Sequence, residues 1–485
     1  MSTQSTERTT PSTSAPPSGG RLGIALWVIV TCQLMLGLDA TVVTIALPRI
    51  QHAHGMDFSA SSLSWVQNAY LLAFGGLLLL GGRAGDIVGR RKVFVAGVVL
   101  FVAASFAGGL ATSAPMLLTA RAVQGVAAAI AGPSIMALIA TNFQGQARAK
   151  ALAAYSAVTG AGGAVGLLVG GLLADQASWR WVFFINIPIG LAIAVLAPRV
   201  IQETERRSGR FDLGGALLST AGMSTLVYGF IRAASAGWSD SWTVGSIVGA
   251  VLLLAVFVLV ESRVEQPILP LAVFADRERT GAYAAMAILA ATLFGYFFFL
   301  TTLLQTIDGY SPLQAGLAFL PTVVMQFGAA RLAPKLIQRY GPRLPMLVGP
   351  WFVLAGMIWM SQISAGTSYF PGIFVPAALF GAGGGITMMP LNFTVLSRVP
   401  AAISGAASGV AQTMVWAGGA LGSAIFVSIA GTADRTAARD HPHWSAHEVL
   451  VHGMAVAFTA AAGFVVLVLL LIAVVVRRPS EAADH

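Results

Sequence analysis

The stretch that decides the fold is residues 81–92, which read Gly-Gly-Arg-Ala-Gly-Asp-Ile-Val-Gly-Arg-Arg-Lys. This stretch joins two long apolar segments through a very short loop, and its glycines permit a sharp turn and close helix approach. Asp86 is flanked by basic side chains, so we expect at least one ion pair, with Arg83, Arg90, Arg91 or Lys92. A basic loop that only sets membrane topology is the simpler alternative.

Apolar segments on both sides of this loop make up most of the chain. The 485 residues are 56% hydrophobic and 10% charged, whereas soluble chains carry about 25% charged residues. Lipid admits only helices and closed barrels, and barrel strands alternate over about ten residues. The runs here are unbroken, as in 458–476. The sequence therefore predicts an all-α polytopic membrane protein.

Fourteen segments are long enough to span a bilayer at about twenty residues each. They lie near 22–47, 61–82, 93–112, 115–142, 151–175, 180–199, 212–234, 241–260, 280–305, 312–337, 344–363, 369–394, 402–430 and 448–476. With both termini cytoplasmic, 22 of the 28 Lys and Arg residues fall on the inside and five on the outside. This bias follows the positive-inside rule and predicts a multi-pass protein of the inner (plasma) membrane. The net charge of +9 is spread over these loops and forms no single patch for nucleic acid.

A weak internal repeat suggests two halves. Residues 89–91 follow the second segment, and the similar residues 341–343 follow the tenth, although Gln338 replaces the loop's aspartate. Transporters are often built from such repeats. We expect a disordered cytoplasmic tail, an N-terminal six-helix bundle, a linker with two extra spans, a C-terminal six-helix bundle and a second tail, at 1–21, 22–200, 201–262, 263–476 and 477–485. No cleavage site follows the first segment, so it is read as a retained span.

Two charged residues lie well inside apolar segments. Asp39 is the only acid placed deep in a span, and Arg121 is the only such cation. Charged groups inside a membrane are costly and are functional candidates by default. Arginine stays protonated, so only the aspartate can exchange a proton. An acid that reaches water near the boundary, and an arginine that satisfies carbonyl groups, are the alternatives. The remaining acids of the spans are expected at segment ends, where water reaches them: Asp175, Asp212, Glu261 and Asp308.

The fifth segment is rich in glycine. Spacings of four residues between small side chains allow close helix crossing, and the residues that follow this pattern are Gly162, Gly166, Gly170 and Gly171. Packing alone is an equally good explanation of the pattern.

Several of these stretches resemble motifs of the major facilitator superfamily. Residues 82–92 resemble its signature loop, which in that family helps to lock the cytoplasmic gate; the matching positions are Gly82, Asp86, Gly89, Arg90, Arg91 and Lys92. Residues 38–48 and 118–125 are similar to the first-span aspartate and fourth-span arginine motifs of the fourteen-span drug:proton antiporters. Residues 160–171 resemble the antiporter motif, except that Leu167 occupies the place of its proline. The stretches 179–190, 266–277 and 305–316 also look like hallmarks of these exporters.

The resemblance implies two six-helix bundles with two inserted helices, and a monomer that moves small-molecule cargo and protons across the bilayer. Aromatic and Met residues deep in the spans are candidates for an apolar cargo cavity, although ordinary helix packing explains each of them as well: Phe294, Tyr296, Met388, Met389 and Trp416. A metal site among His441, His443, His447 and His452 lacks a Cys or a well-spaced acid, so we expect no metal and no cofactor.

We therefore expect a proton-driven exporter of amphipathic drug-like or antibiotic molecules. No nucleotide-binding loop is present, so an ion gradient should supply the energy. A dedicated exporter or uniporter of one endogenous metabolite is the alternative within transport. An intramembrane enzyme would need paired acids or a His–acid set inside the spans, and the sequence shows none, so no enzymatic activity is expected.

Overall fold

The structure is a computed structural model that describes residues 19–59, 61–204, 212–264, 267–269, 271–364, 366–396, 399 and 404–475. The described residues form helices and no strands. The first half contains α1 Gly19–Gln51, α2 Trp65–Val88, α3 Arg90–Gly109, α4 Ala114–Asn142, α5 Gly145–Gln176, α6 Trp181–Phe184, α7 Asn186–Val200, α8 Leu213–Ala236 and α9 Ser241–Glu261. The second half contains α10 Arg277–Thr302, α11 Pro312–Ala318, α12 Leu320–Tyr340, α13 Arg343–Met360, α14 Phe374–Leu396, α15 Ser404–Asp440 and α16 Ala446–Val475. Short 3-10 or π turns join some of them, at Ser62–Ser64, Leu271–Phe274, Leu303–Ile307 and Tyr369–Ile373.

The helices have the length and composition of membrane spans. Within the described residues, thirteen helical segments are long and apolar enough to cross a bilayer. The remaining expected segment, 151–175, lies in helix α5, which is 32 residues long. The apolar part of α5 among the described residues is Val165–Gln176. The protein is thus a multi-pass membrane protein whose helix order follows the expected segments. The tails and the basic residues at 206, 207, 210, 398, 477 and 478 lie outside the described residues.

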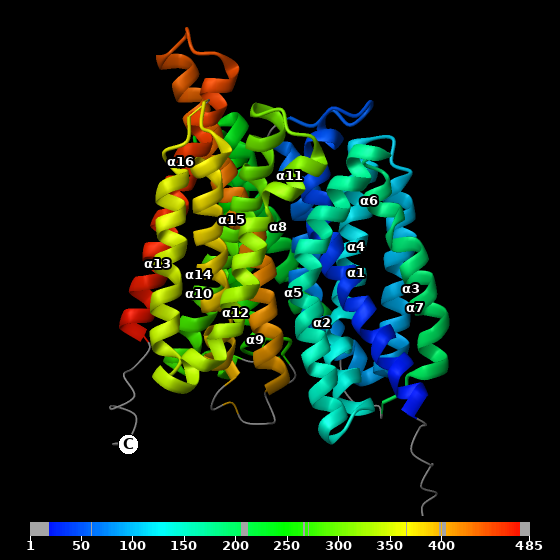
Figure 1. Cartoon of the computed structure of the whole chain (residues 1–485). Coiled ribbons are helices and arrows are strands. Elements are labelled where there is room, and N and C mark those ends of the chain that lie inside the picture. Colours follow the sequence, from blue (N-terminus) through cyan, green and yellow to red (C-terminus); the bar gives the residue numbers. More distant parts are fainter. Residues whose placement is uncertain are drawn as a thin grey trace, which may run out of the picture.

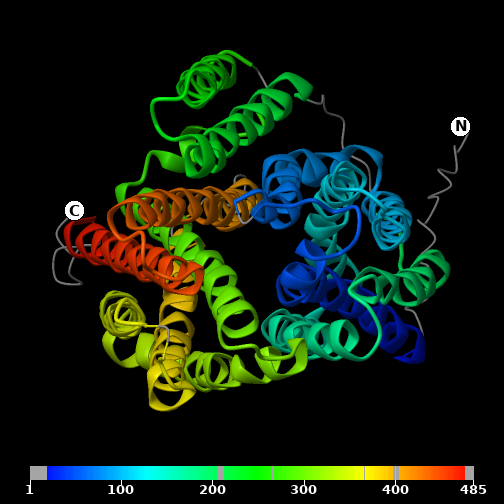
Figure 2. The same cartoon turned by 90° about the horizontal axis from the view of Figure 1, so that it is seen from above.

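Two groups of helices stand side by side with a pair of helices at the edge. Figure 1 shows α1–α7 on one side and α10–α16 on the other. Helices α8 and α9 pack against each other, and α8 also contacts α2 and α15, one helix from each group. Seen from above, this pair lies outside the other helices (Figure 2). The inserted pair therefore touches the seam between the two groups.

The two ends of the bundle differ in shape, and arginine side chains join neighbouring segments at one of them. At the end that we call the basic end, Arg91, Arg277 and Arg343 donate hydrogen bonds to the carbonyl oxygens of Ile201, Val474 and Ala473. At the other end, which we call the hairpin end, α15 and α16 project beyond their neighbours (Figure 1).

The projection corrects the expected end of the thirteenth span. We expected α15 to stop near residue 430 and a loop to follow, but the helix continues to Asp440 over 37 residues. At 1.5 Å per residue this is about 55 Å, longer than the roughly 30 Å hydrocarbon core. Apolar length alone could not reveal an extension built from polar, helix-compatible residues such as Arg435 and Arg439.

Aspartates begin several of the helices. Asp212 Oδ1 accepts a hydrogen bond from the Gly215 N–H at 2.8 Å, and Asp240 Oδ2 accepts one from the Thr243 N–H at 2.9 Å. Such side chains satisfy donors that a helix leaves free at its start. The Arg232 guanidinium also donates to Asp240 at 2.6 Å. This bond holds the pKa of Asp240 down to about 2, so the turn between α8 and α9 carries a charge pair.

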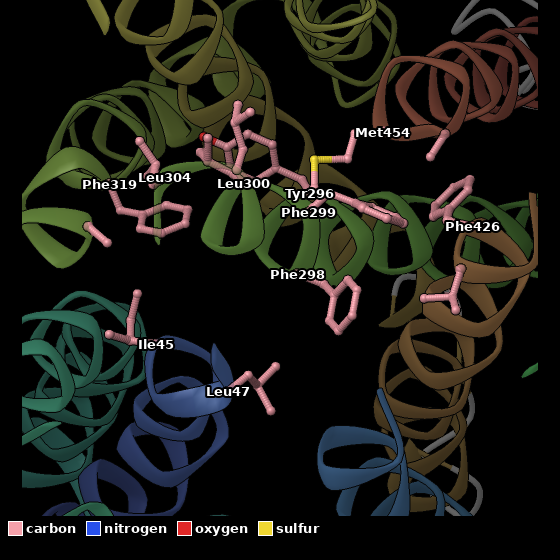
Figure 3. Close-up of a cluster of buried hydrophobic side chains, with 14 of the residues drawn as sticks. Ile45, Leu47, Tyr296, Phe298, Phe299, Leu300, Leu304, Phe319, Phe426 and Met454 are labelled. Carbon is pink, nitrogen blue, oxygen red and sulfur yellow. The ribbon is translucent and has the colours of Figure 1, made fainter. Parts of the chain in front are cut away.

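The two groups close against each other at the hairpin end. A cluster of buried apolar side chains draws members from both of them, including Ile45 and Leu47 of α1 and Leu304 and Phe319 from the other group (Figure 3). The Gln305 amide donates to the Ile45 carbonyl oxygen at 2.8 Å. This apolar seal and its hydrogen bond hold the two groups together at the hairpin end.

Candidate functional site

A buried ion pair lies at the centre of the first group of helices. Arg121 Nη1 of α4 donates to Asp39 Oδ2 of α1 at 2.6 Å, and both side chains are fully buried. Removing one partner of a buried pair costs roughly 3–5 kcal/mol because the other charge is left uncompensated. Neither partner of this contact between α1 and α4 can therefore be removed alone without a loss of stability.

Amide side chains complete the surroundings of the carboxylate. Asp39 Oδ1 accepts from Asn186 Nδ2 at 2.9 Å and from Gln124 Nε2 at 3.1 Å. Gln124 Oε1 accepts in turn from Arg121 Nη1 at 2.9 Å, and its amide nitrogen also donates to Ser105 Oγ at 2.8 Å. All of these side chains are buried. The ionised carboxylate thus has a preformed set of donors from α4 and α7.

Arg121 is held from its other side as well. Its Nε donates to the Val66 carbonyl oxygen at 2.9 Å, and its Cζ lies 4.4 Å from the centre of the Tyr70 ring. Its Nη2 has no hydrogen-bond partner in the described part of the chain. Because Arg121 cannot give up its proton, Asp39 is the member of this cluster that can change charge.

The sequence analysis singled out Asp39 and Arg121 but not the other members of the cluster, Gln124 among them. Asn186 was visible only as a polar residue in the run Phe-Ile-Asn-Ile-Pro, and Ser105 and Tyr70 stand in long apolar segments. A buried amide in a lipid-length segment is unusual and needs partners. That was the signal for Asn186, whereas nothing in the sequence distinguished Ser105 or Tyr70.

The loop at 81–92 turns at Gly89, whose φ of +113° is a backbone conformation that favours glycine. Asp86 pairs with Arg90 one helical turn later. Gly82 approaches α4, where an added Cβ would lie 3.6 Å from Pro133. The expected ion pair of Asp86 is therefore present, and the turn is tight.

Glu203, which the sequence did not single out, anchors this loop. Its carboxylate accepts from the backbone N–H groups of Arg91 at 2.9 Å and of Lys92 at 3.3 Å, at the start of α3. Arg91 Nε lies 3.8 Å from the same carboxylate. An acid at a helix N-terminus is favoured by the free N–H groups and by the helix dipole. The loop is thus tied to the segment that follows α7.

The glycines of α5 face two different helices. An added Cβ at Gly166 or Gly170 would press on the backbone of Leu38 and Val42 in α1, at 2.9 Å in each case, and Gly162 approaches Gly37. Gly171 faces the other group instead, where an added Cβ would lie 2.6 Å from the Pro312 carbonyl oxygen of α11. Leu167, which stands in the place of the motif's proline, is buried within an unbroken helix.

The five cargo candidates do not gather in one cavity. Trp416 of α15 lies between Phe294 of α10, with ring centroids 6.0 Å apart, and Phe74 of α2, at 4.5 Å. Tyr296 is buried, stacks on Phe380 at 4.2 Å and hydrogen-bonds Thr322 at 2.7 Å.

Met388 lines a small pocket of about 40 Å³ together with Leu289, Leu293, Gln326, Val353, Phe380 and Gly384. Met389 does not line this pocket, and its side chain is 43% exposed. Phe294 and Trp416 thus belong to one aromatic cluster, whereas Met388 lines a separate pocket that includes Phe380, the ring on which Tyr296 stacks. Met389 belongs to neither.

One of the acids expected at a water-accessible segment end is buried. Glu261 was expected in contact with water but is 3% exposed, and its Oε2 accepts from the Leu269 N–H at 3.2 Å. Asp434 lies within the extended α15, and its Oδ1 is buried without a partner in the described part of the chain. Asp39 is therefore not the only buried acid among the described residues. Asp39 is distinguished by its arginine and amide partners.

The histidines near the hairpin end stack with tryptophan. The His441 and Trp444 rings are 4.2 Å apart and nearly parallel, and His452 meets Trp444 edge-on at 5.6 Å. Among the described residues, no group of three or more His, Cys, Asp or Glu side chains is placed to hold a metal ion.

The model of the family described as Major Facilitator Superfamily matches residues 29–423. The chain belongs to this family. It is a membrane transporter and not an enzyme, in keeping with its apolar helices and its buried charge cluster.

Relatives with export or resistance names match most of the chain. The puromycin resistance protein pur8 of Streptomyces alboniger is 41% identical, over 95% of this chain and 92% of that protein. The cephamycin export protein CmcT of Amycolatopsis lactamdurans is 38% identical, over 84% and 85%. The tetracenomycin C resistance and export protein of Streptomyces glaucescens is 34% identical, over 88% and 79%.

Solved structures share the fold at low identity. A bacterial homologue of the human lysosomal transporter Spinster, inward-facing and unoccupied, has a TM-score of 0.68 at 15% identity and covers 94% of this chain and 97% of its own. A D-xylose–proton symporter has a TM-score of 0.64 at 17% identity, covering 93% and 97%. These likenesses confirm the expected major facilitator fold.

Proposed function

We propose that this protein is a proton-driven exporter of amphipathic drug-like or antibiotic molecules that works by alternating access in the cytoplasmic membrane. The resistance and export names of relatives that match most of the chain support the cargo class. The energy source is argued from the site, because the Asp39 cluster contains one group that can bind and release a proton inside a span.

The observation that carries the proposal is the buried Asp39–Arg121 pair. In the ionised state the carboxylate has the arginine, Asn186 and Gln124 as partners. A proton on Asp39 would cancel its charge and weaken these charge-assisted bonds. Protonation therefore changes how tightly α1 is held to α4 and α7. Such a change would alter how the neighbouring helices, which form the path of the cargo, pack against α1.

The closed hairpin end supports alternating access. Both groups contribute to the apolar seal, and the Ser311 hydroxyl donates to Asp175 across the groups at 3.3 Å. A state closed at one end leaves the basic end as the side on which cargo enters. By the positive-inside rule that end faces the cytoplasm.

We expect energised inverted membrane vesicles that contain the protein to accumulate ethidium and puromycin. Adding a protonophore should return the accumulated amount to that of vesicles without the protein, because the proton gradient is the energy source. Fluorescence quenching and filtration assays measure the two compounds. Accumulation that persists without the gradient, or transport of neither compound while an endogenous metabolite is moved, would contradict the proposal.

Topology is the second expectation. Reporter fusions after residue 478 should report the cytoplasm, and fusions within 441–445 should report the outside, because the basic residues favour this orientation. Active alkaline phosphatase at 441–445 and active green fluorescent protein after 478 are the expected signals. A cytoplasmic signal from the 441–445 site would overturn both the orientation and the fourteen-span arrangement.

The loop at 81–92 should govern the rate of switching and not the affinity for cargo. Asp86→Asn removes the pair with Arg90 at the basic end, away from the aromatic residues of the seam. A partly exposed pair of this kind contributes up to about 1 kcal/mol, so we expect a two- to fivefold slower transport rate with an unchanged ethidium dissociation constant. Arg83→Gln is the matched comparison for Asp86→Asn, because it also removes one charge from the same loop. A parallel loss of ethidium binding in Asp86→Asn would remove the loop's assignment as a gate.

A further inference from the structure

We propose that Tyr70 of α2 transmits the charge state of the Asp39–Arg121 pair to the seam between the two groups of helices. Tyr70 acts as a positioning residue, since it contacts the charge cluster on one side and the seam on the other. This inference rests on the proposed proton-coupled export and assigns a residue to the coupling step.

The first contact of Tyr70 is with the charge cluster. Its ring is fully buried, and the Arg121 Cζ lies 4.4 Å from the ring centre. A cation over an aromatic face is attracted by the ring, and the attraction is larger away from water. In the present state the guanidinium divides its interactions between the Tyr70 ring and the Asp39 carboxylate at 2.6 Å.

The second contact is with the seam. Tyr70 meets Trp416 of α15 edge-on at 6.4 Å and Phe74 of its own helix at 5.7 Å. Next to these rings the two backbones are very close, because an added Cβ at Gly75 would lie 3.0 Å from the Ala417 nitrogen. The aromatic cluster of Tyr70, Phe74, Phe294 and Trp416 is thus part of the direct contact between α2 and α15.

The role assigned to Tyr70 belongs to its ring and not to its hydroxyl. The hydroxyl is buried and has no hydrogen-bond partner in the part of the chain that the structure describes. A buried unsatisfied hydroxyl is unfavourable, and phenylalanine would fill the same space without that cost. On the side of the Tyr70 ring that faces α15, the neighbouring rings are those of Trp416 and Phe74, which are uncharged. The titratable or charged side chains that act on Tyr70 are Asp39 and Cys32 of α1 and Arg121 of α4.

These contacts suggest how the proton is sensed. When Asp39 binds a proton, the anion that competes with the ring for the guanidinium disappears, and the attraction between Arg121 and Tyr70 grows. The ring then moves with Arg121 and changes its edge contact with Trp416. Because Trp416 belongs to the other group, the seam between the groups responds to the proton.

The test measures ethidium binding to the purified protein by fluorescence anisotropy between pH 5.5 and 8.5, a range in which the dye keeps its charge. In the wild type, the dissociation constant should rise at low pH, where the proton opposes cargo. At high pH, the dissociation constant of Tyr70→Leu should stay within about threefold of the wild-type value. The ratio of its dissociation constants at low and high pH should be roughly tenfold smaller than in the wild type, which matches the size of a desolvated cation–π contact. Tyr70→Phe keeps the ring and should keep the pH dependence.

Phe101→Leu is the matched control, because Phe101 is a fully buried aromatic residue of α3 outside this aromatic cluster. It should lower stability and leave the pH dependence intact. Should Tyr70→Leu fail to fold, Trp416→Leu interrupts the same route from its far side and should flatten the pH dependence equally. If folded Tyr70→Leu or folded Trp416→Leu keeps the full wild-type pH dependence, the role of Tyr70 is overturned, whereas the proposed proton coupling is not. Binding that is independent of pH in the wild type would overturn the proposed proton coupling, and this inference with it.

Discussion

Asp39→Asn should abolish gradient-driven efflux while leaving downhill exchange of cargo. Asparagine keeps the size of the side chain and can still bond Asn186 and Gln124, but it cannot bind and release a proton. Accumulation of ethidium in energised vesicles should fall to the level of vesicles without the protein. Counterflow of labelled against unlabelled cargo, which needs no net proton movement, should remain within a fewfold of wild type.

The unpaired arginine is the complication that a control must address. In Asp39→Asn, Arg121 remains buried without its counter-ion, which costs roughly 3–5 kcal/mol of stability. The double variant Asp39→Asn/Arg121→Gln removes that charge and should regain thermal stability without regaining uphill efflux. Full uphill efflux in the folded single variant would exclude Asp39 from coupling and direct attention to Glu261, another buried acid among the described residues.

Gly171→Ala should shift the protein away from the state that is closed at the hairpin end. The new methyl group would meet the Pro312 carbonyl oxygen at 2.6 Å and the Leu313 Cα at 3.0 Å, both in the backbone of the other group. Overpacking of this kind costs about 1–3 kcal/mol, which corresponds to a shift of roughly 5- to 150-fold between two states.

Labelling of a cysteine at position 47 reports this shift. Leu47 is buried in the seal, and the one native cysteine, Cys32, is buried as well. A membrane-impermeant maleimide should label Leu47→Cys at least several-fold faster when Gly171→Ala is present. Gly163→Ala is the control on the same helix, since its nearest neighbour would be Thr41 Cγ2 at 3.9 Å. Equal labelling rates in the two backgrounds would show that Gly171 does not support closure.

The order of helices was predictable from the sequence, because a segment of about twenty apolar residues in lipid must satisfy its backbone hydrogen bonds internally and therefore forms a helix. Asp39 and Arg121 were recognisable for the same reason, since a lone charge in such a segment needs a partner. Their direct contact is a finding of the structure, which places Arg121 Nη1 2.6 Å from Asp39 Oδ2. Asn186 comes from a helix 147 positions along the chain from Asp39, a contact that no local pattern contains.

Features that depend on side-chain direction were not predictable from the sequence. Tyr296 and Met389 are apolar residues deep in spans, yet one is fixed in the core of its group and the other is exposed. Glu203 follows α7 and reaches the start of α3 only through the fold. The length of α15 depends on helix propensity and tertiary packing past the membrane boundary, where hydropathy carries no information.

Proton movement driven by cargo tests the central claim most directly. Purified protein is reconstituted in liposomes with a pH-sensitive dye inside and no initial proton gradient, and an outward ethidium gradient is then imposed. If Asp39 couples the two fluxes, outward flow of ethidium draws protons inward, so the interior should become acidic in wild-type liposomes. No such change should occur with Asp39→Asn/Arg121→Gln, although ethidium still leaves. Equal acidification in both, or none in the wild type while ethidium leaves, would contradict proton coupling through Asp39.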